Sequence, residues 1–307
     1  MQTTIVTSGS AYLDIDAYAC CIAFAELLRK QGKPAYAYAT APCNYSVSPS
    51  LSHPGFLMRT LPKELSPSDL RYILVDVSNP AFFEDSVPLE QVEAVYDHHA
   101  GFEDFWTARI GDRAHISFIG AAATLIFDEW KRSGLLQAIS RSSAALLTAG
   151  ILENTLNLNS GITTARDRNA VQKLSEMFAF GDEWRATYFS EVQNGLEAGL
   201  PENALRDVKT IADTNTLPAK FIQLCVWDTD RIVSRLPELR RSFDGHFKSW
   251  MLNLVDIQRC RGNLICFDAA YQQKLAALYG IQFRNGIAAF PKMYLRKELM
   301  KIANCPG

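Results

Sequence analysis

The chain has 307 residues, of which 48% are hydrophobic and 21% charged, and its formal net charge is −2. This length favours two domains, and the composition is typical of a globular protein. The near-neutral charge argues against general nucleic-acid binding, which needs a basic surface. No apolar run reaches membrane-spanning length and the first residues lack the basic start of a secretory signal, so we expect a cytoplasmic protein without membrane contact.

The seven cysteines give an odd count and form no CxxC pair. Cys20 and Cys21 are adjacent within a helical pattern, which suits neither a disulfide framework nor a zinc site. We therefore expect reduced thiols, in agreement with a cytoplasmic location.

The first half of the chain alternates short apolar runs with longer helical patterns. The expected strands are 3–9, 35–40, 72–78 and 93–96, and the expected helices are 17–30, 120–131, 140–153 and 165–178. Residues 42–67 are rich in Ser, Pro and Asn and predict an irregular excursion. The alternation predicts an α/β fold whose N-terminal domain holds a doubly wound, mainly parallel sheet.

The second half carries another α/β pattern after a looser stretch at 195–204. We expect a first domain over 1–187, a linker over 188–203, and a smaller α/β domain over 204–307. The expected strands are 220–226, 249–255 and 262–267, the expected helices are 231–242 and 269–279, and a last strand and helix fall within 281–302.

Acidic and imidazole side chains fall at or just after the ends of the expected strands in the first half. They are Asp14, Asp16, Asp76, Asp97, His98 and His99. Ligands of α/β sheets bind outside the carboxyl ends of the strands, so we expect these side chains to meet. Carboxylate and imidazole are ligands of divalent first-row metals. The pattern predicts a site for one or two ions, and the expected ligands are Asp14, Asp16, Asp76 and His98.

Ordinary structural roles compete with this interpretation. Asp14 and Asp16 are also suited to capping the helix that follows them. Asp76 suits a turn, and adjacent histidines occur in ordinary loops. The coincidence of all these residues at strand ends favours the metal site.

These motifs, in this order, resemble the DHH phosphoesterase superfamily. The matching segments are 13–17 (LDIDA), 74–78 (LVDVS), 97–99 (DHH), 119–124 (IGAAAT), 150–155 (GILENT) and 163–167 (TTARD). The resemblance covers nearly all of residues 1–170. The second half is similar to the domain found in manganese-dependent inorganic pyrophosphatases and exopolyphosphatases. The resemblance implies an active site in the interdomain cleft.

The resemblance also implies a chemistry. It implies a hydrolase that cleaves a phosphoanhydride or phosphoester with a metal-bound hydroxide, using two Mn²⁺ or Mg²⁺ ions. Asp97 is expected to orient a histidine, and His99 to contact phosphate or the leaving oxygen. Lys209, Arg296 and Lys297 are expected to bind substrate phosphates, although Arg296 and Lys297 also suit a solvated helix face.

Two positions depart from the pyrophosphatase pattern. Ser10 stands where that group has a metal-binding histidine, and Asn154 stands where it has an aspartate. Both are weak ligands, which makes Mg²⁺ more plausible beside Mn²⁺ and tilts the resemblance toward exopolyphosphatases, which also lack the first histidine. The departures keep a second reading open, a catalytically impaired protein that binds a phosphorylated ligand or a partner.

A third reading is a nucleotide phosphodiesterase. The Gly-Gly-Gly-His signature of the nuclease branch is absent from the sequence, which counts against an oligoribonuclease. The expected partner is a small phosphorylated substrate. Pyrophosphate, polyphosphate and an organic phosphate ester all remain open as substrates, and a homodimer is one of the open oligomeric states.

Overall fold

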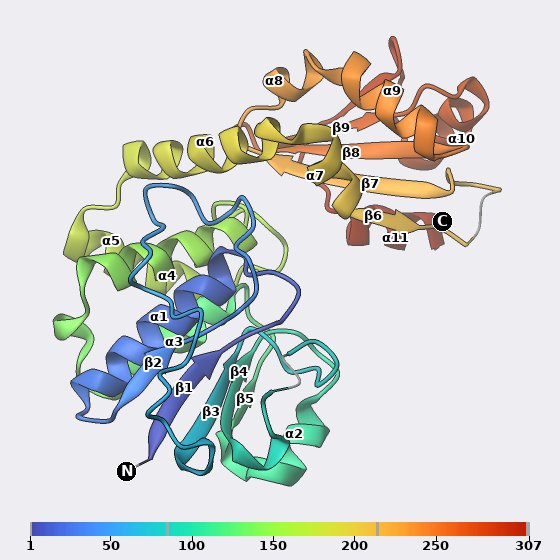
Figure 1. The fold of residues 1–307 in the computed structure, drawn as a ribbon. Helices are drawn as coiled ribbons and strands as arrows, with labels where there is room; N and C mark the ends of the chain where they lie inside the picture. Colours follow the sequence, from blue (N-terminus) through green and yellow to red (C-terminus); the bar gives the residue numbers. More distant parts are fainter. Residues whose placement is uncertain (1, 84–85, 213–214, 305–307) are drawn as a thin grey trace. The chain divides into compact units, whose positions relative to one another are not determined.

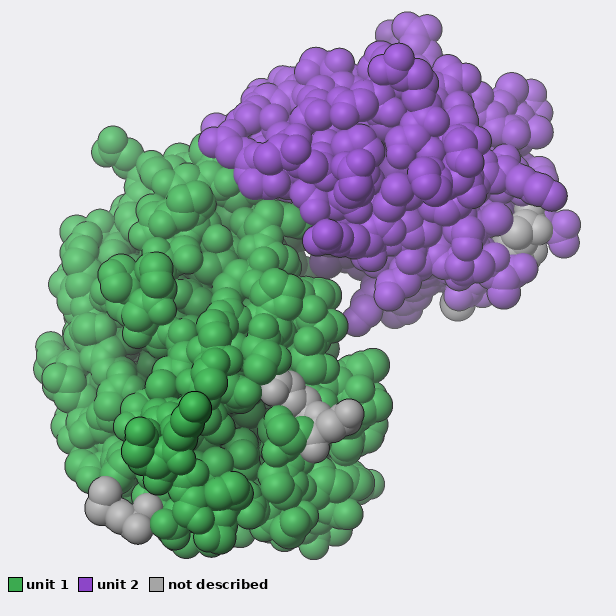
Figure 2. Space-filling model, in the orientation of Figure 1, with its two compact units in different colours: residues 1–192 green, residues 193–307 purple. Residues whose placement is uncertain are grey.

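The chain folds into two compact units, residues 1–192 and 193–307, which we call the first and second unit (Figure 2). The computed structural model describes residues 2–83, 86–212 and 215–304. Within these residues, no helix has both the length and the apolar character needed to cross a membrane.

The first unit is built on a parallel five-stranded sheet (Figure 1). In spatial order its strands are β2 (Ala35–Ala37), β1 (Thr3–Thr7), β3 (Leu70–Val75), β4 (Val92–Asp97) and β5 (Ala114–Ile116). Every neighbouring pair is parallel. The central strands β3 and β4 are buried along almost their whole length, which is why they read as continuous apolar runs. The predicted parallel α/β domain is confirmed.

Two helices connect strands of this sheet, α1 (Ile15–Lys30) from β1 to β2 and α2 (Glu103–Ile110) from β4 to β5. The helices after β5 are α3 (Ala122–Arg132), α4 (Arg141–Asn154), α5 (Ala165–Phe178) and α6 (Asp182–Ala198), and α6 continues into the second unit. Helix α1 begins earlier than predicted, because Asp14 accepts the backbone N–H of Ala17 at 3.0 Å and caps it. Helix α2 was not predicted; it buries Trp106 in a core with Leu74 and Val95.

Helices α1, α3 and α4 pack on one another beside the sheet. The indole of Trp130 in α3 donates to the carbonyl of Ala23 in α1 at 3.1 Å. Gly150 allows α4 to approach α1 closely, since a Cβ there would lie 3.2 Å from the Cα of Asp16. The end of α4 is therefore held against the start of α1.

The excursion over 42–67 supports the loop that precedes α1. The N–H of Asn44 donates to the carbonyl of Leu13 at 2.8 Å, and the N–H of Ile15 donates to Oγ of Ser46 at 2.8 Å. The side chain of Asn44 in turn accepts the Ser46 hydroxyl at 2.6 Å. The predicted irregular segment thus has a definite structural role.

The second unit holds a mixed sheet. Its strands in spatial order are β10 (Ile287–Phe290), β9 (Arg261–Ile265), β8 (Trp250–Asp256), β7 (Lys220–Val226) and β6 (Val208–Thr210). Only the β7–β8 pair among them is parallel within the described residues. Its helices are α7 (Leu200–Arg206), α8 (Thr229–Val233), α9 (Leu236–His246), α10 (Ala269–Tyr279) and α11 (Arg296–Asn304). The predicted smaller α/β domain is confirmed, and the expected linker 188–203 lies within α6 and α7.

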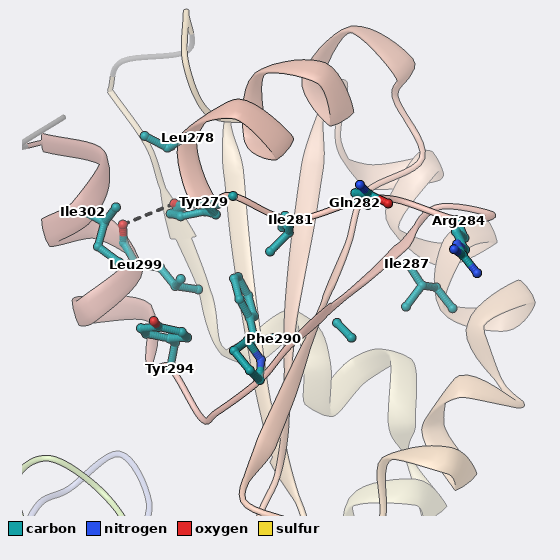
Figure 3. A pocket seen from close by; sticks show the side chains of 13 residues that line it. Leu278, Tyr279, Ile281, Gln282, Arg284, Ile287, Phe290, Tyr294, Leu299 and Ile302 are labelled. Atoms are coloured by element: carbon teal, nitrogen blue, oxygen red, sulfur yellow. Dashed lines mark hydrogen bonds between the residues drawn. The ribbon is translucent and has the colours of Figure 1, made fainter. Parts of the chain in front are cut away.

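A cavity of about 660 Å³ lies in the second unit between α10, β10 and α11 (Figure 3). Its walls are mainly apolar, with Ile281, Phe290 and Leu299 among them, and the Tyr279 hydroxyl donates to the Leu299 carbonyl at 3.2 Å. None of the predicted site residues lines it.

Candidate metal centre

The carboxyl edge of the parallel sheet gathers the predicted site residues of the first unit. After β1 the chain crosses to β2 on one side, whereas β3 lies on the other side, so the topology switches between β1 and β3. Asp14 follows β1, Asp76 directly follows β3, and Asp97 ends β4. The strands end at similar levels, with Thr7 opposite Leu74. A crevice at such a switch point is the usual ligand site of an open α/β sheet.

Asp76 has a backbone conformation that aims its carboxylate into this edge. Its φ is +55°, in the left-handed region that few non-glycine residues adopt. Its Oδ1 lies 3.4 Å from Nε2 of His98 and 3.8 Å from Nδ1 of His99. Burial and the nearby charge of Asp16 raise the pKa of Asp76 well above its usual value. A cation beside this carboxylate would offset the unfavourable effect of its burial.

His98 is fixed by its other ring nitrogen. Nδ1 lies 3.2 Å from the carbonyl oxygen of Ile119, which favours a proton on Nδ1 and turns Nε2 toward Asp76. Burial lowers the pKa of His98, but the nearby carboxylates of Asp76 and Asp16 outweigh it and raise the pKa to about 10. Without a cation, His98 is thus an imidazolium at neutral pH.

Asp97 holds His99 and the backbone of the DHH segment. Its Oδ1 accepts Nδ1–H of His99 at 2.8 Å and the backbone N–H groups of His98 and His99 at 2.8 and 3.2 Å. Burial opposes the charged carboxylate, but the His99 hydrogen bond prevails and lowers the pKa of Asp97. The same hydrogen bond raises the pKa of His99. With Nδ1 engaged, Nε2 of the largely exposed His99 ring is left for another partner.

Asp16 is fully buried and works as a hydrogen-bond acceptor. Its Oδ1 accepts the N–H of Ala123 at 2.8 Å, and its Oδ2 accepts the N–H of Ala122 at 2.8 Å. The amide Nδ2 of Asn154 donates to the same Oδ2 at 2.6 Å. The carboxylate therefore sits at the N-terminus of α3, where backbone N–H groups stabilise negative charge, and it ties α3 and the end of α4 to α1.

Asp14 and Ser10 lie on the open side of the edge. One carboxylate oxygen of Asp14 caps α1, and burial together with the charge of Asp16 raises the pKa of Asp14. The exposed Ser10 hydroxyl donates to the carbonyl of Phe82 at 3.1 Å. Both residues line a cavity that also reaches Asp76 and His99.

The ligand atoms of Asp76, His98 and His99 lie within 4.8 Å of one another, and we call these residues the three-residue cluster. At 3.4 and 3.8 Å neither imidazole makes a normal hydrogen bond to Oδ1 of Asp76, which is buried without a hydrogen-bond partner among the described residues. A buried carboxylate oxygen facing two imidazoles fits a divalent cation. Asp14 and Asp16 lie outside this group.

The predicted phosphate-binding residues lie in the second unit. Lys209 in β6 and Lys297 in α11 are exposed. Arg296 is half-buried and forms a bidentate ion pair with Asp207, with Nη2–Oδ1 at 2.8 Å and Nη1–Oδ2 at 3.2 Å. Its guanidinium is therefore already engaged.

Glu153 is a site residue to which the sequence analysis assigned no role. It lies in the last turn of α4, and burial together with the charges of Asp14 and Asp16 raises its pKa to about 8. The signal available in the sequence was an acid directly before Asn154 in the 150–155 motif.

Curated proteins and solved structures resemble this chain over most of its length. No family model matches the chain. The chain is 28% identical over 302 residues to a Deinococcus radiodurans protein named "probable manganese-dependent inorganic pyrophosphatase", with 93% of this chain and 92% of that protein covered.

Among solved structures, a Methanococcus jannaschii protein described as a "putative family II inorganic pyrophosphatase" matches with a TM-score of 0.54 at 17% identity, over 99% of this chain and 100% of that chain. An exopolyphosphatase-related protein from Bacteroides fragilis matches with a TM-score of 0.53 at 14% identity, over 99% of this chain and 91% of that chain. At these identities the structures show the fold alone. The chain resembles the manganese-dependent inorganic pyrophosphatase and exopolyphosphatase branch of the DHH phosphoesterases. The likeness extends over most of its sequence and includes its fold.

Proposed function

We propose that the chain is a metal-dependent phosphohydrolase that cleaves a phosphoanhydride or phosphoester. The observation that carries the proposal is the three-residue cluster, a buried carboxylate and two imidazoles at the switch point of a parallel sheet. The similarity to proteins named manganese-dependent inorganic pyrophosphatases supports a phosphoanhydride among the substrates.

The residues of the cluster have distinct tasks in this proposal. Asp76 and Nε2 of His98 hold the cation, and the Ile119 carbonyl keeps the His98 ring in the ligating orientation. A divalent ion there, Mn²⁺ or Mg²⁺, supplies Lewis-acid chemistry that lowers the pKa of an attacking water. A second ion needs Asp14 or Asp16 as a further ligand.

His99 acts on the substrate. Asp97 accepts a hydrogen bond from Nδ1 and raises the pKa of the ring, which favours an Nε2–H that donates to a phosphate oxygen or to the leaving oxygen. Lys209 and Lys297 bind substrate phosphates as point charges. Arg296 joins them only after it leaves Asp207.

The test is a phosphate-release panel with pyrophosphate, polyphosphate and an organic phosphate ester, each with Mn²⁺, Mg²⁺ and Co²⁺. Asp76→Ala is expected to lower metal-dependent release about a hundredfold or more, because it removes the central ligand. Asp104→Ala removes an exposed acid in the first turn of α2 and is the control, expected to leave release unchanged. Unchanged hydrolysis in Asp76→Ala contradicts the mechanism.

A second candidate is a catalytically impaired protein that binds a phosphorylated ligand. It is favoured by Ser10 and Asn154, whose polar groups are engaged with the Phe82 carbonyl and with Asp16. A calorimetric Mn²⁺ titration beside the panel separates the two. Metal binding with no phosphate release from any substrate supports this candidate, and metal binding with release supports the enzyme.

A further inference from the structure

Asp167 is a buried carboxylate that lies outside the three-residue cluster. It belongs to the first turn of α5, where it completes a capping box with Thr164. Its Oδ2 accepts the backbone N–H and the hydroxyl of Thr164, each at 2.7 Å. A capping box explains these two contacts, but it needs no partner outside its own helix end. Asp167 has two such partners.

Both outside partners belong to the segment that follows β5. The backbone N–H of Gly120 donates to Oδ2 of Asp167 at 3.1 Å, and the hydroxyl of Thr124 donates to Oδ1 at 2.5 Å. These partners are 47 and 43 positions away in the chain. The buried carboxylate is therefore well supplied with donors, and its hydrogen bonds fix its position relative to the start of α3.

The missing side chain of Gly120 allows its peptide group to approach Asp167. A Cβ at position 120 would lie 2.5 Å from Cγ2 of Thr155 and 2.7 Å from Oδ2 of Asp167. Atoms that are not bonded to a Cβ do not come this close to it, so a side chain here would push Asp167 or Thr155 away. The hydrogen bond from Gly120 to Asp167 therefore depends on glycine.

The N–H of Gly120 and the carbonyl of Ile119 belong to one planar peptide group. The oxygen of this group lies 3.2 Å from Nδ1 of His98. Asp167 therefore contacts one end of a rigid unit whose other end holds the His98 ring. Hydrogen bonds in such a chain polarise one another, so a carboxylate at the N–H makes the carbonyl oxygen a stronger acceptor. A stronger acceptor at Nδ1 favours a proton there and makes Nε2 a better ligand.

We propose that Asp167 is a positioning residue of the metal site, which acts on His98 through the peptide group between Ile119 and Gly120. The carboxylate holds this peptide group in place and makes its oxygen more negative. Both effects raise the affinity of Nε2 of His98 for a divalent cation. The inference rests on the metal site of the proposed function, whereas it requires no turnover.

The test measures Mn²⁺ binding by calorimetry and thermal unfolding of the metal-free chain for the same variants. Asp167→Asn keeps an acceptor for the N–H of Gly120 and removes the charge, and we expect it to weaken Mn²⁺ binding about tenfold. Asp167→Ala removes the acceptor as well and is expected to weaken binding further, toward about a hundredfold. The absorption spectrum of bound Co²⁺ depends on the donor strength of its imidazole ligand, so Asp167→Asn should also shift this spectrum.

Thr124→Val is the matched control. It removes one hydrogen bond to the same carboxylate and leaves the contact between Asp167 and Gly120. We therefore expect a lower melting temperature, with Mn²⁺ affinity and the Co²⁺ spectrum as in the wild type. Equal weakening of Mn²⁺ binding by Thr124→Val and Asp167→Asn would overturn the proposal, because it would show that Asp167 only stabilises the fold. Wild-type affinity in Asp167→Asn would overturn it too.

The same titrations separate this inference from the proposed function. Weaker Mn²⁺ binding in Asp167→Asn, with no phosphate release by the wild type from any substrate, supports the positioning role and contradicts the hydrolase. Phosphate release by the wild type, with unchanged Mn²⁺ affinity in Asp167→Asn, supports the hydrolase and overturns the positioning role. A wild-type chain that binds no Mn²⁺ overturns both.

Discussion

The side-chain amide of Asn154 donates a hydrogen bond to Oδ2 of Asp16 at 2.6 Å. The same oxygen accepts the N–H of Ala122 at 2.8 Å. An oxygen with two donors has little lone-pair capacity left for a cation. Asn154 thus engages the carboxylate that the sequence analysis expects among the metal ligands, and it joins the end of α4 to the start of α1.

Asn154→Asp is expected to strengthen Mn²⁺ binding. The substitution removes the donor and places a second carboxylate beside Asp16, so that a cation relieves the repulsion between them. We expect about tenfold tighter binding, or a second bound ion, in a calorimetric titration. Asn159→Asp adds the same charge at an exposed position just beyond α4 and is the control. Identical titrations of Asn154→Asp and the wild type would contradict this role of Asn154.

Metal binding is expected to release a proton and to strengthen with rising pH. In the metal-free chain the pKa of His98 is about 10, so at neutral pH the ring must lose a proton before Nε2 can ligate. Each unit of pH below that pKa therefore weakens binding by up to about tenfold. Calorimetry in two buffers with different ionisation enthalpies counts the protons released. An affinity that stays flat between about pH 6.5 and 8.5 speaks against an imidazolium at this position.

Glu153→Gln is expected to stabilise the metal-free chain at alkaline pH. Burial and the charges of Asp14 and Asp16 raise the pKa of Glu153 to about 8, above its ordinary value of 4.5. Between pH 4.5 and about 8, Glu153 is therefore protonated in the folded state and ionised in the unfolded state. The free energy of unfolding falls as the pH rises through this range.

Glutamine resembles the protonated carboxyl and does not ionise, so the variant does not lose folding stability in this pH range. Thermal unfolding at about pH 9 should show a melting temperature a few degrees above that of the wild type, and at about pH 5 the two should coincide. Glu183→Gln, at an exposed site in the first turn of α6, is the control. Equal melting temperatures of Glu153→Gln and the wild type at alkaline pH would show that ionisation of Glu153 does not destabilise the folded chain.

Thiol reactivity is expected to differ sharply along the chain. Cys20 and Cys21 are fully buried in α1, and burial raises the pKa of both thiols. Cys260 is exposed. Because the thiolate is the reactive form, iodoacetamide should label Cys260 in the folded chain and Cys20 and Cys21 only after unfolding. Peptide mass mapping before and after denaturant checks this, and early labelling of Cys20 would indicate that α1 opens readily.

Strong local patterns made part of the structure predictable. Strand β7 (Lys220–Val226) and helix α5 (Ala165–Phe178) have the predicted bounds, because each combines a clear period with clear ends. Helix α2 and strand β6 were missed. Both are short, and α2 is held mainly by the burial of Trp106 and Ile110 in the core, which no local pattern announces.

The candidate metal centre, like the fold, was predictable only in part. The acids and histidines were predicted from their positions at strand ends, which topology alone brings to one edge. The positive φ of Asp76, the hydrogen bond from Asn154 to Asp16 and the raised pKa of Glu153 depend on tertiary contacts between residues far apart in the chain. Such contacts carry no local signature.

The excursion over 42–67 is bonded to the turn that carries Asp14, through Asn44 to Leu13 and through Ser46 to Ile15. Any ion that selects one conformation of that turn also selects the conformation of the excursion, and the coupling free energy is the same in both directions. A bound ion therefore lowers the equilibrium constant for opening of residues 42–67 by a certain factor. Opening of these residues lowers the affinity for the ion by the same factor. A protease that cuts only the opened excursion would then report ion occupancy from a distance.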